Sequence, residues 1–81
     1  MKSSSALEAI GNTPLVELSS VRPEGGARIF VKWEGANPTG SMKDRMAKAM
    51  IHGATAKGDL APGQHVVEYT GGSTGSSLAL V

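Results

Sequence analysis

The chain has 81 residues, of which 40% are hydrophobic, and its formal net charge is +1. This composition is typical of a globular protein and gives no electrostatic reason to expect a nucleic-acid or membrane partner. A chain this short buries only a small core, yet it has no cysteine for a disulfide, and its two scattered histidines, His52 and His65, are too few for a zinc site.

The two ends of the chain carry different signals. The first residues, "MKSSSALEAIGNTP", lack the apolar stretch of a secretory signal, and no uninterrupted apolar segment is long enough to cross a bilayer. We therefore expect a cytoplasmic protein. The last residues, "GSSLALV", begin an apolar, helix-like pattern that stops at Val81 without a terminating glycine or polar residue. We interpret residues 1–81 as the N-terminal portion of a longer enzyme domain, truncated at its C-terminus.

The first half of the chain is predicted to form one short helix and two strands. Residues 4–10 have a serine cap and apolar positions at helical spacing, and Gly11 would end that helix. Residues 13–18 ("TPLVEL") form a predicted strand. Residues 28–35 ("RIFVKWEG") alternate between two faces, which predicts a strand with one well-buried face. That face carries Ile29, Val31 and Trp33.

The second half is predicted to alternate between helix and strand. Residues 41–57 have apolar residues at helical spacing, and the glycine that follows them is available as a C-terminal cap. Residues 65–71 ("HVVEYTG") form a predicted strand that is buried on both faces. Residues 70–76 form a loop of glycines and hydroxyl residues that opens into a second helix. The methionines expected to pack in the core are Met42, Met46 and Met50.

This order of elements predicts an α/β protein with a parallel open sheet and flanking helices. In such sheets, ligands bind beyond the carboxyl ends of the strands. Two unusual loops, residues 35–41 and 70–76, lie at positions of that kind. If their strands are neighbours, both loops face one crevice, which is the predicted binding site.

Lys43 follows the first of these loops and lies at the start of the predicted helix. Pro38 biases Asn37 away from helical angles, and Ser41 is placed to cap the helix, so that Lys43 occupies its second position. The positive end of the helix dipole disfavours an ammonium there and favours a neutral amine that attacks a carbonyl carbon. An ordinary solvated lysine is the alternative.

The second loop, "TGGSTGSS", places backbone N–H groups between a strand and a helix, which suits a carboxylate or a phosphate. A flexible turn in which Ser73 or Thr74 caps the helix agrees equally well with the sequence. Neither loop is a nucleotide motif. Gly35 and Gly40 are not followed by the adjacent lysine and hydroxyl of a P-loop, and the second loop lacks the first glycine of a Rossmann fingerprint.

Three further residues of the predicted helix invite an acid–base interpretation. Spacing pairs Asp44 with Lys48 and leaves His52 alone in a polar position, while Arg45 is one more charge on the helix. Ordinary surface charges are the better interpretation for all three.

Three segments together resemble the beginning of the cysteine synthase family: "IGNTPLVEL", "VKWEGANPTGSMKDRMAKAMI" and "VVEYTGGSTGSSLALV". These are fold-type II pyridoxal-phosphate enzymes, related to cystathionine β-synthase and to the serine and threonine dehydratases. The motifs occur in the family's order and spacing from about residue 8 to the end of the chain. Three motifs in register are far more specific than any one of them.

The resemblance implies roles for the matching residues. Lys43 matches the lysine that holds pyridoxal phosphate covalently and removes the substrate α-proton. Residues 70–75 match the family segment that grips the amino-acid carboxylate and touches the ring oxygen of the cofactor. The implied cofactor-binding residues are Lys43 and Ser73, and the implied substrate-binding residues are Thr70, Gly71, Gly72 and Thr74. No metal is implied.

Two positions depart from the family's "T-S-G-N-T-G" pattern. Gly71 replaces a serine, and Ser73 replaces the asparagine that hydrogen-bonds the ring hydroxyl, so these changes bear on which amino acid is the substrate. The family's phosphate-binding loop and the residue facing the pyridine nitrogen lie beyond this segment. We therefore expect these 81 residues alone to be inactive.

The activity implied by the resemblance is pyridoxal-phosphate-dependent β-replacement. An O-activated serine, such as O-acetylserine, would react with a sulfur nucleophile to give cysteine. The implied partners are a small amino-acid substrate and a sulfur donor, and the implied assembly is a homodimer that binds neither nucleic acid nor membrane. Two alternatives stay open: a serine/threonine dehydratase-like lyase, and a catalytically incompetent fragment that acts at most as a binding piece.

Overall fold

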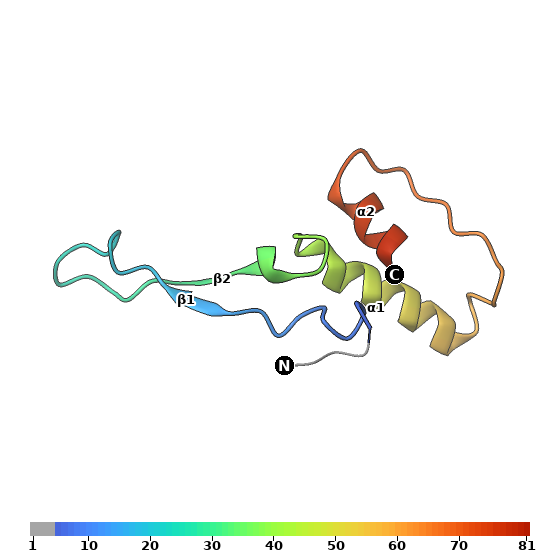
Figure 1. Ribbon diagram of the computed structural model, residues 1–81, viewed down its shortest axis with the longest axis horizontal. Coiled ribbons are helices and arrows are strands. Elements are labelled where there is room, and N and C mark those ends of the chain that lie inside the picture. The colour runs from blue at the N-terminus through green and yellow to red at the C-terminus, as the bar shows by residue number, and fades with distance from the viewer. Residues whose placement is uncertain (1–4) are drawn as a thin grey trace.

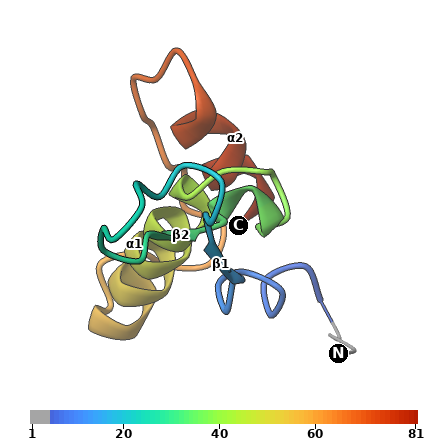
Figure 2. The same cartoon turned by 90° about the vertical axis from the view of Figure 1, so that its left-hand side faces the viewer.

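Two strands and two α-helices make up the regular structure of residues 5–81, which are the residues that the computed structural model describes (Figure 1). The elements in chain order are β1 (Leu15–Glu17), β2 (Phe30–Lys32), the 3-10 turn η1 (Glu34–Ala36), α1 (Lys43–Lys57) and α2 (Ser73–Leu80). The β1–β2 hairpin extends away from the helices as an arm (Figure 1). The two helices pack against each other, as both views show (Figure 1 and Figure 2).

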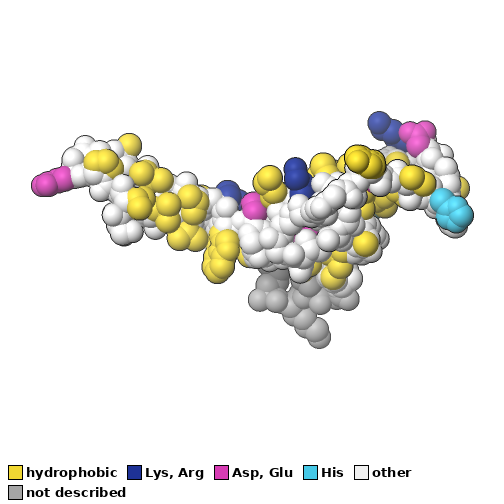
Figure 3. All heavy atoms as spheres, turned by 90° about the horizontal axis from the view of Figure 1, so that it is seen from above, with side chains coloured by type: hydrophobic (Ala, Val, Ile, Leu, Met, Phe, Trp, Pro, Cys, Tyr) yellow, Lys and Arg dark blue, Asp and Glu magenta, His cyan; other side chains and the backbone are white. Residues whose placement is uncertain are grey.

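The hairpin confirms the centres of two predicted strands but not the predicted burial. Val16 pairs with Val31 in antiparallel register. On the other face, the Arg28 guanidinium lies 2.9 Å from the Glu17 carboxylate and 4.9 Å from the centre of the Phe30 ring. Hydrophobic side chains are visible along the arm in Figure 3, because no second layer of described residues covers a face of this two-stranded sheet. The residues of the predicted buried face, Ile29, Val31 and Trp33, are 37%, 39% and 58% exposed.

Helix α1 confirms the predicted helix over 41–57 but buries a different face. It ends before Gly58, whose φ of 82° is the left-handed conformation typical of a C-terminal cap. The buried residues of α1 are Asp44 and Ala47, on the side where α2 packs. The predicted burial of the methionines is therefore wrong for Met42 and Met50, which are 58% and 46% exposed.

Two predicted elements do not form. Residues 5–10 make turns instead of a helix, because so short a segment gains too few hydrogen bonds to nucleate one, and residue 4 lies outside the described residues. Residues 65–71 have no strand partner within residues 5–81. Val67 in this segment is 92% exposed. The prediction of a buried strand there is wrong for this structure, since a strand needs a neighbour for its N–H and C=O groups.

The chain is extended for its length. Its radius of gyration is 16.6 Å, whereas a compact chain of this size would have about 12 Å. The content of helices and strands agrees with the predicted α/β class, but the one strand pair among the described residues is antiparallel. Its direction follows from two turns in the connection, at Ser19–Arg22 and Pro23–Gly26, which reverse the chain.

Candidate functional site

The first predicted site loop leads directly into helix α1. Asn37 precedes Pro38 and has an extended backbone with ψ of 156°, as predicted. Gly40 has φ of 83°, a left-handed conformation that glycine adopts without strain. The Ser41 hydroxyl oxygen accepts a hydrogen bond from the Lys43 N–H at 3.0 Å. The N-cap residue of α1 is Met42, so the prediction of Ser41 as the cap is wrong by one residue, although its hydroxyl still accepts from the first N–H of the helix. Lys43 is the first residue of α1 rather than the second.

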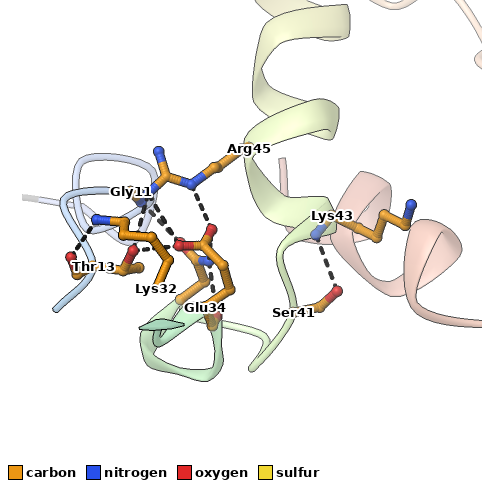
Figure 4. Close-up of polar contacts among 8 residues, drawn as sticks. Gly11, Thr13, Lys32, Glu34, Ser41, Lys43 and Arg45 are labelled. Atoms are coloured by element: carbon orange, nitrogen blue, oxygen red, sulfur yellow. Dashed lines mark hydrogen bonds and ion pairs between the residues drawn. The ribbon is translucent and has the colours of Figure 1, made fainter. Parts of the chain in front are cut away.

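Lys43 differs from the neighbouring cations of α1 because its amine has no partner among the described residues. The Arg45 Nε lies 2.5 Å from the Glu34 Oε1, and the Lys48 Nζ donates to the Leu7 carbonyl oxygen at 3.1 Å. The side chains of Lys43 and Arg45 leave α1 in opposite directions (Figure 4). Lys43 is half-buried, and an amine without a partner is free to attack a carbonyl carbon.

Asp44 follows Lys43 and is fully buried. Its carboxylate accepts hydrogen bonds from the Thr39 N–H at 2.8 Å, from the Thr39 hydroxyl, and from the Ser77 hydroxyl at 2.6 Å. Burial raises the pKa of Asp44, but the hydrogen bonds from Ser77 and Thr39 outweigh burial and hold the pKa below its usual value. The interpretation of Asp44 as a surface charge paired with Lys48 is wrong, because its carboxylate ties the start of α1 to α2.

The loop predicted to bind substrate is folded around Thr70. The Thr70 hydroxyl oxygen accepts hydrogen bonds from the Gly72 and Gly75 N–H groups at 3.3 and 3.2 Å. Ser73 and Thr74 are the first two residues of α2, and its N-cap residue is Gly72, which has no side chain. The alternative in which Ser73 or Thr74 caps α2 is therefore wrong. The N–H groups of these two residues have no acceptor inside the helix.

The contact between Thr70 and Gly75 predicts the effect of an added methyl group. A Cβ at residue 75 would lie 2.7 Å from the Thr70 Cγ2, so in Gly75→Ala we expect Thr70 to rotate and lose its hydrogen bonds to the loop. Hydrogen exchange at the residue 75 amide should become about tenfold faster. Gly71→Ala is the matched control, because a Cβ there meets nothing within 4 Å. Equal exchange in the two variants would contradict the prediction.

A second polar cluster joins the base of the hairpin to α1. The Glu34 carboxylate accepts hydrogen bonds from Arg45 and from the Thr13 hydroxyl. The Asn37 side chain donates to Glu34 and accepts from the Gly11 N–H at 2.8 Å. Figure 4 shows Gly11, Thr13, Glu34 and Arg45 converging. The hydrogen bonds from Arg45 and Thr13 lower the pKa of Glu34 to about 2 against the opposing effect of desolvation. Arg45 is exposed, as predicted for a surface charge, and it also forms the ion pair of this cluster.

Acid is expected to weaken the Glu34 cluster. The pKa of Glu34 falls from an ordinary value of 4.5 to about 2 on folding, so between these values the unfolded protein binds more protons than the folded one. The stabilising contribution of Glu34 is complete above this range and is lost as the pH falls through it. Thermal unfolding followed by circular dichroism should show that acid lowers the unfolding midpoint less in Glu34→Gln than in the unsubstituted protein. Glu24→Gln, in the exposed connection between β1 and β2, is the control, and the same decrease in all three proteins would contradict the prediction.

The structure packs the two helices that follow the predicted site loops against each other and adds residues that the sequence did not suggest. Helix α1, which begins with Lys43, packs against α2, which begins with Ser73. The hydrogen bond between Asp44 and Ser77 joins them. Helical spacing could have predicted the burial of Asp44, because Asp44 lies three residues before Ala47 on one face of α1. No such signal existed for Ser77, whose partner is distant in the sequence.

Metal-binding clusters and membrane-spanning helices are not found in residues 5–81. No group of at least three histidine, cysteine, aspartate or glutamate side chains is placed there to hold a metal ion. Neither helix in this part of the chain is long and apolar enough to cross a membrane.

Comparison with known sequences gives matches along nearly the whole chain. Residues 6–81 match the family described as "Pyridoxal-phosphate dependent enzyme". Cysteine synthase B of Salmonella typhimurium is 49% identical over 74 residues, which cover 91% of this chain and 24% of that protein. A cysteine synthase of Flavobacterium sp. is 48% identical over 81 residues, which cover 100% of this chain and 26% of that protein. The chain thus spans about a quarter of the length of these relatives.

Solved structures of similar enzymes share the fold of this chain. The crystal structure of an O-ureido-L-serine synthase has a TM-score of 0.88 and 44% identity, and the match covers 98% of this chain and 25% of that one. The cysteine synthase of Entamoeba histolytica has a TM-score of 0.89 and 40% identity, with 99% of this chain and 25% of that one covered. This likeness confirms the predicted α/β fold class.

Proposed function

The chain belongs to the family of pyridoxal-phosphate dependent enzymes, and from this premise we propose that it carries the cofactor lysine and the substrate loop of a cysteine synthase-like enzyme. In the proposed reaction, a sulfur nucleophile replaces the activated hydroxyl group of an O-activated serine, such as O-acetylserine, and gives cysteine. Relatives named cysteine synthase, at 49% and 48% identity, support this choice of reaction.

The amine of Lys43 is the observation that carries the proposal. It begins a helix, it is half-buried, and unlike Arg45 and Lys48 it has no partner among the described residues. These features fit pyridoxal phosphate, which needs an unpaired amine for covalent attachment. When bound, the cofactor supplies a ring that withdraws electrons from the α-carbon of an amino acid. We propose that the Lys43 Nζ holds the cofactor and then removes the α-proton.

The proposed substrate site is the loop around Thr70. The N–H groups of Ser73 and Thr74 lie at the positive end of α2, where a carboxylate is stabilised. The Thr70 hydroxyl oxygen accepts hydrogen bonds from the N–H groups of Gly72 and Gly75, and the hydroxyl can donate its own hydrogen to a carboxylate oxygen. Gly71 and Gly72 have open space where a Cβ would lie, which leaves room for an amino acid. The exposed Ser73 hydroxyl is the proposed donor to the ring oxygen of the cofactor.

Borohydride reduction tests the assignment of the lysine. The protein made from its complete reading frame is incubated with pyridoxal phosphate, reduced, digested and examined by mass spectrometry. We expect a pyridoxyl group on Lys43 and on no other lysine. A label on Lys48 in place of Lys43, or no label at all, would reject the proposal.

Product analysis tests the reaction. With O-acetylserine and sulfide as substrates, a replacement enzyme forms cysteine, whereas a dehydratase-like lyase releases pyruvate and ammonia. We expect cysteine to form much faster than pyruvate. Pyruvate as the main product, with Lys43 labelled, would keep the cofactor assignment and replace the proposed reaction with elimination.

A further inference from the structure

A buried carboxylate without a cationic partner connects the two parts of the proposed site. Asp44 and Ser77 are both 0% exposed. None of the ion pairs among the described residues involves Asp44, and its charge is compensated by the hydrogen bonds from Thr39 and Ser77. Hydrogen bonds are directional, so this arrangement constrains both the distance and the rotation of α2 relative to the start of α1.

The order of residues along both helices places this carboxylate next to the proposed site. Asp44 directly follows Lys43. Ser77 lies four residues after Ser73 and three after Thr74, and these spacings put the three residues on one face of α2. The hydrogen bond of 2.6 Å between Asp44 and Ser77 therefore connects the neighbour of the proposed cofactor lysine to the helix face that carries the proposed ligand-binding residues.

Thr39 extends the same connection to the loop before Lys43. Its N–H and its hydroxyl both donate to the Asp44 carboxylate, and its hydroxyl oxygen lies 3.5 Å from the Ser77 hydroxyl oxygen. One carboxylate thus holds the loop that enters α1 and the helix that follows the substrate loop. Each of these three residues comes from a different segment, so the connection exists only in the folded chain.

We propose that Asp44 is a positioning residue, which holds residues 70–75 at the correct distance from Lys43 through its hydrogen bonds to Ser77 and Thr39. The inference rests on the proposed function, because it takes Lys43 as the cofactor lysine and residues 70–75 as the substrate loop. Asp44 itself touches neither cofactor nor substrate in this role. Its importance follows from the sensitivity of catalysis to geometry, since a displacement of about 1 Å can lower a rate by about 100-fold.

Ser77→Ala tests the inference because it removes the donor on α2 and leaves both Thr39 hydrogen bonds to Asp44. Ser76→Ala is the matched control: it is the same change in the same helix, one residue earlier, at an exposed position. Three quantities are measured on the protein made from its complete reading frame. They are hydrogen exchange at the amides of residues 70–75 without cofactor, borohydride labelling of Lys43, and KM and kcat for the amino-acid substrate.

In Ser77→Ala we expect exchange in residues 70–75 to become about tenfold faster and KM to rise about tenfold, with Lys43 still fully labelled. Ser76→Ala should match the unsubstituted protein in all three measurements. A residue that only stabilised the fold would lower the unfolding temperature without changing KM in the folded protein. If Ser77→Ala fails to fold, Thr39→Val removes the other hydroxyl that donates to the same Asp44 oxygen and should produce the same increases.

The outcomes separate the two proposals. Loop exchange and KM that are the same in Ser77→Ala and Ser76→Ala would overturn the positioning role of Asp44 and leave the proposed function standing. An unsubstituted protein in which Lys43 takes no label would overturn the proposed function and, with it, the role of Asp44 in substrate binding. Faster loop exchange without a change in KM would also overturn that role.

Discussion

Lys43→Ala is expected to abolish covalent attachment of pyridoxal phosphate and to lower kcat/KM for cysteine formation by at least about 1,000-fold. The substitution removes the amine that we propose to hold the cofactor and to act as the base for the α-proton. Neither Arg45 nor Lys48 can replace it, because Arg45 is paired with Glu34 and Lys48 donates to a backbone carbonyl. Reduction with borohydride, followed by peptide mapping, measures attachment, and a cysteine assay measures kcat/KM.

Two variants control this experiment. Lys43→Arg keeps the positive charge but forms no stable covalent bond with the cofactor, so it should be as inactive as Lys43→Ala. Lys57→Ala makes the alanine change at an exposed position in the last turn of α1 and should leave activity unchanged. Substantial activity in Lys43→Ala, or restored activity in Lys43→Arg, would contradict the assigned role.

Asp44→Ala is expected to lower the free energy of unfolding by about 3 kcal/mol. The change leaves the buried Ser77 hydroxyl and the donors of Thr39 without their acceptor. Hydrogen bonds to an ionised group contribute more than those between neutral groups, so this loss should exceed that of a typical surface substitution. Urea titration of the protein measures the loss as a lower midpoint with an unchanged m value.

Two further variants, Asp44→Asn and Asp59→Ala, test why Asp44→Ala lowers the free energy of unfolding. The asparagine keeps the size of the side chain and one acceptor oxygen, so it should cost less than the alanine. Asp59 is exposed and lies just beyond α1, and its replacement should change the free energy of unfolding by no more than about 0.5 kcal/mol. An Asp44→Ala protein as stable as Asp59→Ala would show that the buried carboxylate contributes little.

Local sequence signals predicted the individual elements well where the determinants are close together in the chain. The run of helical residues between Ser41 and Gly58 predicted α1, and Pro38 predicted the extended conformation of Asn37. Alternation around Val31 predicted a strand at β2. The same local signals predicted too much burial, because periodicity shows which residues share a face but not whether another layer covers that face.

The predicted strand at residues 65–71 shows that β-strand propensity alone does not predict a paired strand. Its β-branched and aromatic residues favour an extended backbone, but pairing needs a second strand, and none among residues 5–81 lies beside it. Val67 and the rest of this segment are consequently exposed. The resemblance to a known family covered this segment as well, so family membership was predicted correctly where the local structure was not.

The sequence by itself determined the family, the α/β class and the position of Lys43 at a helix start, because these depend on residue order and on interactions within a few residues. Only the tertiary structure decided which charges are structural. Asp44 looks like a surface charge in the sequence, yet it is buried against Ser77, and the exposed Arg45 is paired with Glu34. The reason is physical: the partners lie 33 and 11 residues away along the chain, and only folding brings such groups within hydrogen-bonding distance.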